Sequence, residues 1–150
     1  MDSDQIRRKL RRLPMFDEVY PSDQLPRRRI AKPTLLIANT DGSGKPGQHW
    51  VAIYVQGDGY GELFDSLASR PIRKPFKAFM NSQCRKRWIT NEAQLQSAVS
   101  RFCAHYCVLY CILRSRGFDV ERITRSFKRN DTGLNDVLVH GLVCDNRTRV

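Results

Sequence analysis

The stretch at residues 94–111 constrains this chain most strongly. It begins polar and ends as an apolar run with the periodicity of a buried helix. Three cysteines, Cys103, Cys107 and Cys111, follow at intervals of four residues and therefore share one helix face. The pattern predicts a central helix beginning at Cys103, against which the rest of the chain packs. Cysteines on such a stripe are most often small core residues.

The position of Cys103 suggests a second interpretation. A residue in the first turn of a helix lies at the positive end of the helix dipole, beside unpaired backbone N–H groups, and a thiolate is favoured there. Gln96 lies seven residues upstream, in a loop that can fold back toward the sulfur. Its side-chain amide is a candidate oxyanion donor. A neutral thiol is a poor nucleophile, so this interpretation requires a general base elsewhere in the chain.

A predicted hairpin supplies a candidate base. Residues 49–55 and 61–66 have the composition of strands, and Asp58-Gly59 between them favours a turn. His49 stands at the start of the first strand and Asp65 near the end of the second. The two ends of an antiparallel pair lie side by side, so we expect the carboxylate to orient the imidazole. Taken singly, a strand-edge histidine and a turn aspartate are the simpler interpretations.

The remaining pattern predicts an α+β fold in a single domain spanning residues 1–150. The hydrophobic fraction of 41% suffices for a core. We expect residues 1–33 to be a basic, irregular N-terminal segment beginning with a helix capped by Asp4, and residues 145–150 to be a flexible tail. The other expected strands are 34–39 and 87–90, and the other expected helices are 75–80, 120–127 and 134–143.

Charge and cysteine usage bear on partners and compartment. Lys and Arg number 26 against 15 Asp and Glu, a net charge of +11, which favours contact with nucleic-acid phosphates without sequence reading. No cysteine–histidine spacing typical of zinc is present, so no metal is expected. No apolar run reaches 18 residues and no signal-peptide core is present. We therefore expect an intracellular monomer with reduced thiols and no membrane contact.

The ordered set of these residues resembles the adenovirus-type cysteine endopeptidases, the adenain family. That family has relatives in Maverick/Polinton-type elements and DNA viruses and belongs to the ubiquitin-like-protease clan. The likeness spans roughly residues 14–140. Four features carry it: Gln48-His49-Trp50 opening a strand, Phe64-Asp65, Gln96 seven residues before the cysteine, and Cys103-x-x-x-Cys107 leading an apolar helix.

The resemblance implies a small sheet packed against the helix that begins at the nucleophile, with His49, Asp65, Gln96 and Cys103 as catalytic residues. It also implies cleavage of virion or capsid precursor proteins at sites containing glycine. Adenoviral members are stimulated by DNA and by a basic peptide joined through a disulfide. Cys84, in a predicted basic loop, is the candidate thiol for that peptide. The expected locations are the host nucleus and the virion.

One residue departs from the family pattern, because Ala104 stands where glycine usually follows the nucleophile. A methyl group there would crowd the oxyanion hole unless Ala104 adopts a helical conformation. Two alternatives stay open. One is a processing protease for ubiquitin-like modifiers, although such enzymes typically place the glutamine six residues before the cysteine. The other is a basic DNA-binding packaging protein without catalytic activity.

Overall fold

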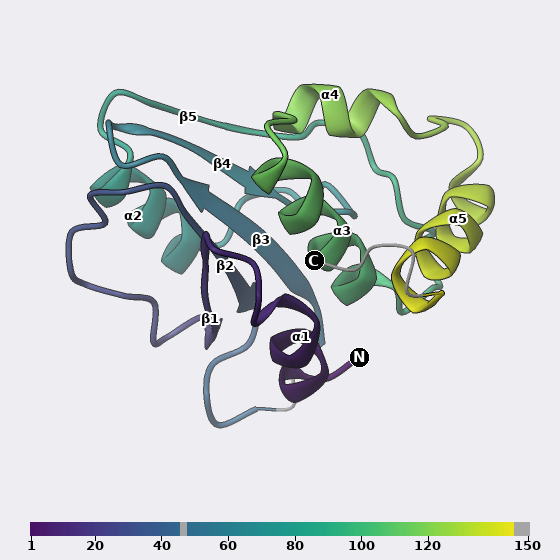
Figure 1. Cartoon of the computed structure of the whole chain (residues 1–150), viewed down its shortest axis with the longest axis horizontal. Coiled ribbons are helices and arrows are strands. Elements are labelled where there is room, and N and C mark those ends of the chain that lie inside the picture. The colour runs from purple at the N-terminus through teal and green to yellow at the C-terminus, as the bar shows by residue number, and fades with distance from the viewer. Residues whose placement is uncertain (46–47, 146–150) are drawn as a thin grey trace.

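The computed structural model describes residues 1–45 and 48–145, and a mixed five-stranded sheet lies at the centre of this part (Figure 1). The central strands β2, β3 and β4 pair antiparallel, whereas each edge strand, β1 and β5, pairs parallel with its neighbour. The spatial order follows the chain: β1 (Phe16–Pro21), β2 (Thr34–Asn39), β3 (Trp50–Val55), β4 (Tyr60–Phe64) and β5 (Arg87–Thr90).

Helices cover the two faces of the sheet, which confirms the expected α+β class. One face carries α2 (Lys74–Gln83), and the other carries the central α3 (Cys103–Ser115). Three further helices pack around α3: α1 (Ser3–Leu10), α4 (Val120–Arg125) and α5 (Thr132–Cys144). None of the described helices is both long and apolar enough to cross a membrane.

Two hydrophobic clusters arise because successive strand residues point to opposite faces. On β2, Leu35 and Ile37 join the cluster around α3, while Leu36 and Ala38 join the cluster around α2. The strand therefore reads as a continuous apolar run rather than an alternating one. This run is why residues 34–39 were predictable as a buried strand.

The central helix is buried along residues 103–112 and is anchored by a buried carboxylate. Glu62, on β4, is fully buried and accepts hydrogen bonds from the hydroxyls of Tyr60 and Tyr110 and from the Val120 N–H. Its Oε2 also lies 3.1 Å from Nε of Arg114. These contacts tie α3 and the start of α4 to the sheet, and so hold the start of α3 in place.

The N-terminal segment is more regular than expected. Its helix begins earlier, because Asp2, rather than Asp4, accepts the hydrogen bond from the Gln5 N–H. Residues 16–21, expected to be irregular, form β1 at the sheet edge, with an irregularity in register after Phe16. That irregularity hides the strand from a search for strict alternation. Pro21 is tolerated because it lies at the end of an edge strand.

The expected flexible tail at 145–150 lies outside the described part of the chain except for Asp145. The other expected helices and strands agree closely with those of the structure. Gly117 follows the end of α3 and has φ of 94°, the left-handed conformation that glycine adopts readily.

Candidate active site

The β3–β4 hairpin brings His49 and Asp65 together, as its geometry predicts. Ala52 pairs with Phe64 in this hairpin, so the residue before β3 and the residue after β4 lie at the same end. The Nε2 atom of His49 is 2.6 Å from Oδ1 of Asp65. Both side chains are largely buried, with 15% and 9% of their surface exposed. The carboxylate therefore sets the orientation of the imidazole and leaves Nδ1 available for a different partner.

Backbone donors hold the Asp65 carboxylate from its other sides. Its Oδ1 accepts a second hydrogen bond from the Leu67 N–H at 2.9 Å, and its Oδ2 accepts one from the Ser69 N–H at 2.9 Å. Burial alone would raise the pKa of Asp65. The hydrogen bond and charge of His49, with the two N–H groups, outweigh burial and lower that pKa below its ordinary value. Asp65 is thus a stable anion next to the imidazole.

Asn91 is a supporting residue that the sequence analysis did not identify. It follows β5 and is 5% exposed. Its Oδ1 accepts a hydrogen bond from the Asp65 N–H at 2.9 Å, and its Nδ2 donates to the Asp65 carbonyl at 2.6 Å. This pair of bonds fixes the backbone that carries the carboxylate. Only the parallel pairing of β4 with β5 brings Asn91 there, and that pairing was not predicted.

Cys103 begins α3, as predicted, and its sulfur meets His49. The His49 side chain and the backbone N–H groups of Trp50 and Ala104 all favour the anionic form of this sulfur. Burial would raise the pKa of the Cys103 thiol, but the imidazole and these two donors outweigh it, so the pKa is lowered. Because Asp65 occupies Nε2 of His49, Nδ1 is the nitrogen that faces the thiol.

The electrostatics favour an ion pair between the two groups. Burial lowers the pKa of His49, but its hydrogen bonds with Asp65 and Cys103 and the charges of both partners raise it to about 9. The lowered thiol pKa and the raised imidazole pKa both favour a thiolate next to an imidazolium over the neutral pair. The arrangement supplies a nucleophile, a proton donor for a leaving group and a carboxylate that stabilises the donor.

Gln96 lies in the loop before α3 and is 2% exposed. Its Nε2 donates to the Ser100 carbonyl at 3.0 Å, and its Oε1 accepts from the Ser66 hydroxyl at 2.7 Å. A carbonyl only accepts, so this contact fixes which end of the amide is NH₂. One amide hydrogen is bound to Ser100, and the second is left for another acceptor.

Ser66 is a second supporting residue that sequence reasoning missed. Besides its hydroxyl contact, its carbonyl accepts the N–H groups of Leu95 and Gln96 at 2.8 and 3.1 Å. Ser66 directly follows Asp65, so one short segment positions both the carboxylate and the Gln96 loop. A serine directly after a strand does not indicate this role, because serine is common in turns.

The other cysteines near the core differ from Cys103. Cys107 and Cys111 are fully buried in α3, and burial raises the pKa of both thiols. Cys84, expected in a basic loop, instead caps α2 and packs in the second core cluster with 3% exposure. Burial raises the Cys84 thiol pKa to about 11, which disfavours disulfide exchange in the folded state.

The conformation of Ala104 resolves the departure from the family pattern. Ala104 is the second residue of α3 and is 1% exposed within the main core cluster. Its methyl group therefore belongs to the core, and its N–H lowers the pKa of the Cys103 thiol. Ala104 has the helical conformation in which its methyl group was not expected to crowd an oxyanion hole.

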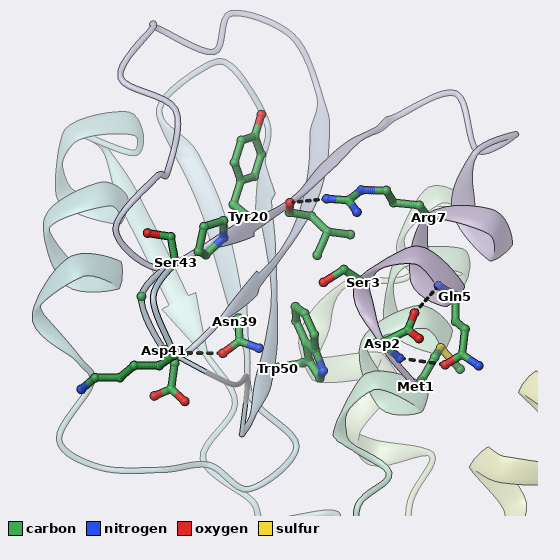
Figure 2. A pocket seen from close by; sticks show the side chains of 14 residues that line it. Met1, Asp2, Ser3, Gln5, Arg7, Tyr20, Asn39, Asp41, Ser43 and Trp50 are labelled. Carbon is green, nitrogen blue, oxygen red and sulfur yellow. Dashed lines mark hydrogen bonds between the residues drawn. The ribbon is translucent and has the colours of Figure 1, made fainter.

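A pocket of about 650 Å³ lies between α1 and the β1–β2 side of the sheet (Figure 2). Trp50 lines it, together with Asp2, Tyr20, Asn39 and Asp41. His49, Asp65 and Cys103 are not among its lining residues. A second cavity of about 250 Å³ is lined by both His49 and Asp65 on the side toward α2.

This α+β fold, with its mixed sheet, is shared with a solved protease structure. The chain matches the crystal structure of ASFV pS273R protease with a TM-score of 0.53 and 21% sequence identity. The match covers 75% of this chain and 44% of that one, so the chain spans less than half the length of the protease. No protein-family model matches the sequence, and no curated protein matches it.

Proposed function

We propose that this protein is a cysteine endopeptidase in which Cys103 is the nucleophile, His49 the general acid and base, and Asp65 the orienting carboxylate. The observation that carries the proposal is the contact of His49 Nε2 with Asp65 Oδ1 at 2.6 Å, together with the mutual effect of His49 and Cys103 on their pKa values. The lowered pKa of that one thiol supports it, since burial alone would act in the opposite direction.

The mechanism follows from the geometry. The thiolate of Cys103 attacks the scissile carbonyl carbon, and the carbonyl oxygen takes the negative charge. The free hydrogen of the Gln96 amide and the Cys103 N–H stabilise this oxyanion. The tetrahedral intermediate collapses as His49 protonates the departing amine, which leaves a thioester. Neutral His49 then removes a proton from water, the resulting hydroxide attacks the thioester, and departure of the sulfur releases the acid product and restores the thiolate–imidazolium pair.

The proposed substrates are structural precursor proteins, such as capsid precursors of a virus or mobile element, cut at sites containing glycine. The family resemblance supports this, as does the matched structure, which is a protease of ASFV. The low accessibility of the sulfur also supports small substrate residues, because Cys103 is only 7% exposed. An extended chain without large side chains at the scissile bond approaches such a sulfur most readily.

We further propose that DNA stimulates the enzyme and that it acts in the host nucleus and the virion. The net charge of +11 supports contact with DNA, since each neutralised phosphate adds affinity that falls with salt. An activating peptide linked to Cys84 has weaker support. Its thiol is buried beneath the end of α2, so a disulfide there requires that helix end to open.

The direct test is cleavage of glycine-containing peptides and precursor proteins by the purified chain, with and without DNA. The proposal predicts cleavage that Cys103→Ala abolishes and that His49→Ala reduces by several orders of magnitude. DNA should raise the rate at low salt and lose its effect as salt increases. Equal cleavage by the parent chain and Cys103→Ala would contradict the proposal.

The fold also supports a second candidate, a processing protease for ubiquitin-like modifiers. Release of a C-terminal Gly-Gly tail from such a modifier, with no cleavage of capsid-type precursors, would favour it. The seven-residue interval from Gln96 to Cys103 favours the first candidate, because the modifier proteases typically have six. A DNA-binding protein without catalysis would show neither activity while keeping salt-dependent DNA affinity.

A further inference from the structure

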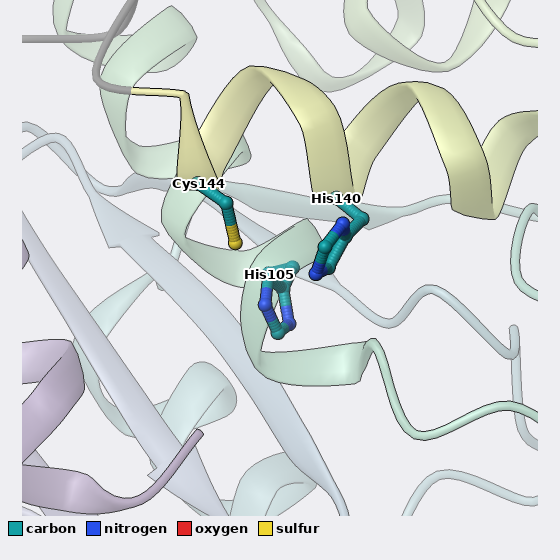
Figure 3. Close-up of side chains that lie close together, drawn as sticks. All are labelled: His105, His140 and Cys144. Atoms are coloured by element: carbon teal, nitrogen blue, oxygen red, sulfur yellow. The ribbon is translucent and has the colours of Figure 1, made fainter.

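A cluster of two imidazoles and a thiol lies away from the catalytic group, where α5 meets the start of α3 (Figure 3). His105 comes from the first turn of α3, and His140 and Cys144 come from α5. One ligand atom from each side chain lies within 4.8 Å of the other two. The sequence analysis expected no metal, because no cysteine–histidine spacing typical of zinc is present.

The spacing of the α5 pair explains how one helix offers two ligands. Residues four apart lie one above the other on a helix face, so His140 and Cys144 point the same way. Figure 3 shows both side chains directed toward His105. Both α5 residues are exposed, so their side chains can change rotamer without disturbing the core. His105, by contrast, is held in place by burial.

The buried imidazole of His105 carries an unused nitrogen. The residue is 9% exposed, and its Nδ1 is buried without a hydrogen-bond partner among the described residues. The ring packs against two other rings, Phe102 at 5.2 Å and His140 at 5.4 Å between centroids. A buried polar atom without a partner is destabilising, and a bound ligand relieves that cost.

We propose that His105, His140 and Cys144 bind a zinc ion that joins α5 to the first turn of the nucleophile helix. Two histidines and a cysteine are a ligand set that zinc uses, with water completing the tetrahedron. Bonds of about 2.0–2.3 Å place tetrahedral ligand atoms roughly 3.3–3.7 Å apart. On zinc binding, the ligand atoms of His140 and Cys144 therefore move about 1 Å closer to the other ligand atoms of the site. The Cys144 thiol releases its proton to solvent as the zinc–sulfur bond forms.

Positive groups face the same hollow and set the conditions for binding. A pocket of about 420 Å³ here is lined by Arg8, Lys9, His105 and Cys144, and the amino terminus lies close. Lys9 Nζ donates to the Val143 carbonyl at 2.9 Å, so its ammonium is already held by the end of α5. The thiolate offsets part of this repulsion. A site with a thiolate and two imidazoles selects a borderline-soft ion over Mg²⁺ or Ca²⁺.

The site is separate from catalysis, and its test does not require peptidase activity. Cys103→Ala is the parent for all measurements, because it removes the thiol beside His49 that would also attract zinc. The parent is titrated with Co²⁺ in reducing buffer while absorbance is recorded, and with Zn²⁺ by calorimetry. The variants add Cys144→Ser or His140→Gln, both at exposed positions, and the control adds His49→Gln.

The expected result is one metal ion per chain, with a thiolate-to-cobalt charge-transfer band and tetrahedral visible bands. Cys144→Ser should abolish the charge-transfer band, and His140→Gln should weaken binding at least about tenfold, whereas His49→Gln should change neither. Zinc at a hundred times its Kd should raise the melting temperature of the parent by about 5 °C and leave Cys144→Ser unshifted. Bands that persist in Cys144→Ser, disappear in His49→Gln or never form in the parent would overturn the proposal.

Discussion

His49 and Asp65, separated by sixteen residues in the sequence, meet with 2.6 Å between Nε2 and Oδ1 at the open end of the β3–β4 hairpin. The contact depends on the register of two strands and needs no long connection. It fixes the imidazole so that its other nitrogen faces the first residue of α3. The hairpin and the first residue of α3 thus bring Asp65, His49 and Cys103 together, although the three residues are far apart in the sequence.

The pH dependence of activity should report the Asp65–His49 contact. Because the His49 pKa is raised to about 9, kcat/KM should stay high up to that pH and fall above it as the imidazolium loses its proton. Asp65→Asn removes a charge and weakens a hydrogen bond that both raise this pKa. The falling limb should therefore move to lower pH, as measured by initial rates between about pH 5 and 10. An unmoved limb would mean that Asp65 does not control His49.

Gln96→Ala should slow cleavage by about a hundredfold, or about 3 kcal/mol of transition-state stabilisation, with the loss mainly in kcat. Ser66→Ala should cause a smaller loss, since it only loosens the amide. Gln24→Ala is the matched control, because Gln24 is an exposed glutamine far from this loop in the sequence. The melting temperature of each variant shows whether a lower rate comes from lost stability. A Gln96→Ala enzyme as active as the Gln24→Ala control would exclude Gln96 from the oxyanion hole.

Ala104→Gly should not improve catalysis, even though it restores the residue usual in the adenain family. The methyl group lies in the core, so its removal loses buried surface and adds backbone freedom in a helix. We expect a loss of about 1–2 kcal/mol in the free energy of unfolding and an unchanged or lower kcat/KM. Ala98→Gly, in the exposed loop, is the control. A large gain in kcat/KM would show that the methyl group does obstruct the site.

Glu62→Ala should destabilise the fold by about 3–5 kcal/mol, because it leaves Arg114 and two tyrosine hydroxyls without their buried acceptor. Glu121→Ala removes an exposed carboxylate 4.0 Å from Arg125 and should change stability by less than about 0.5 kcal/mol. Urea unfolding followed by circular dichroism measures both. Similar losses in the free energy of unfolding in the two variants would show that Glu62 does not anchor α3.

Features that depend on local pattern were predictable from the sequence. The strand at 34–39 is confirmed at both ends, and the helix starting at Cys103 and the 49–66 hairpin are confirmed with small boundary changes. Each has a strong periodic or turn signal. The proximity of His49 and Asp65 followed from hairpin geometry alone, because a short antiparallel connection determines which ends meet.

Features that depend on distant pairing were not predictable. Parallel pairing of β4 with β5 places Asn91 against the Asp65 backbone, and no local signal specifies that pairing. The same holds for Ser66 and the Gln96 loop, thirty residues apart. The meeting of His105 with α5 likewise requires the packing of two helices. Such contacts result from tertiary packing, to which a single sequence gives little access.

The most direct test of the central claim is the alkylation rate of each cysteine by iodoacetamide between about pH 5 and 9, followed by peptide mass mapping. The thiolate is the reacting form and the Cys103 pKa is lowered, so Cys103 should react faster than the other thiols at neutral pH and depend less on pH, and His49→Ala should remove that advantage. Cys84, Cys107 and Cys111 should stay protected by burial, while exposed Cys144 gives the rate of an accessible thiol as reference. A Cys103 rate that rises with pH in parallel with Cys144, or that is unaffected by His49→Ala, would contradict the account.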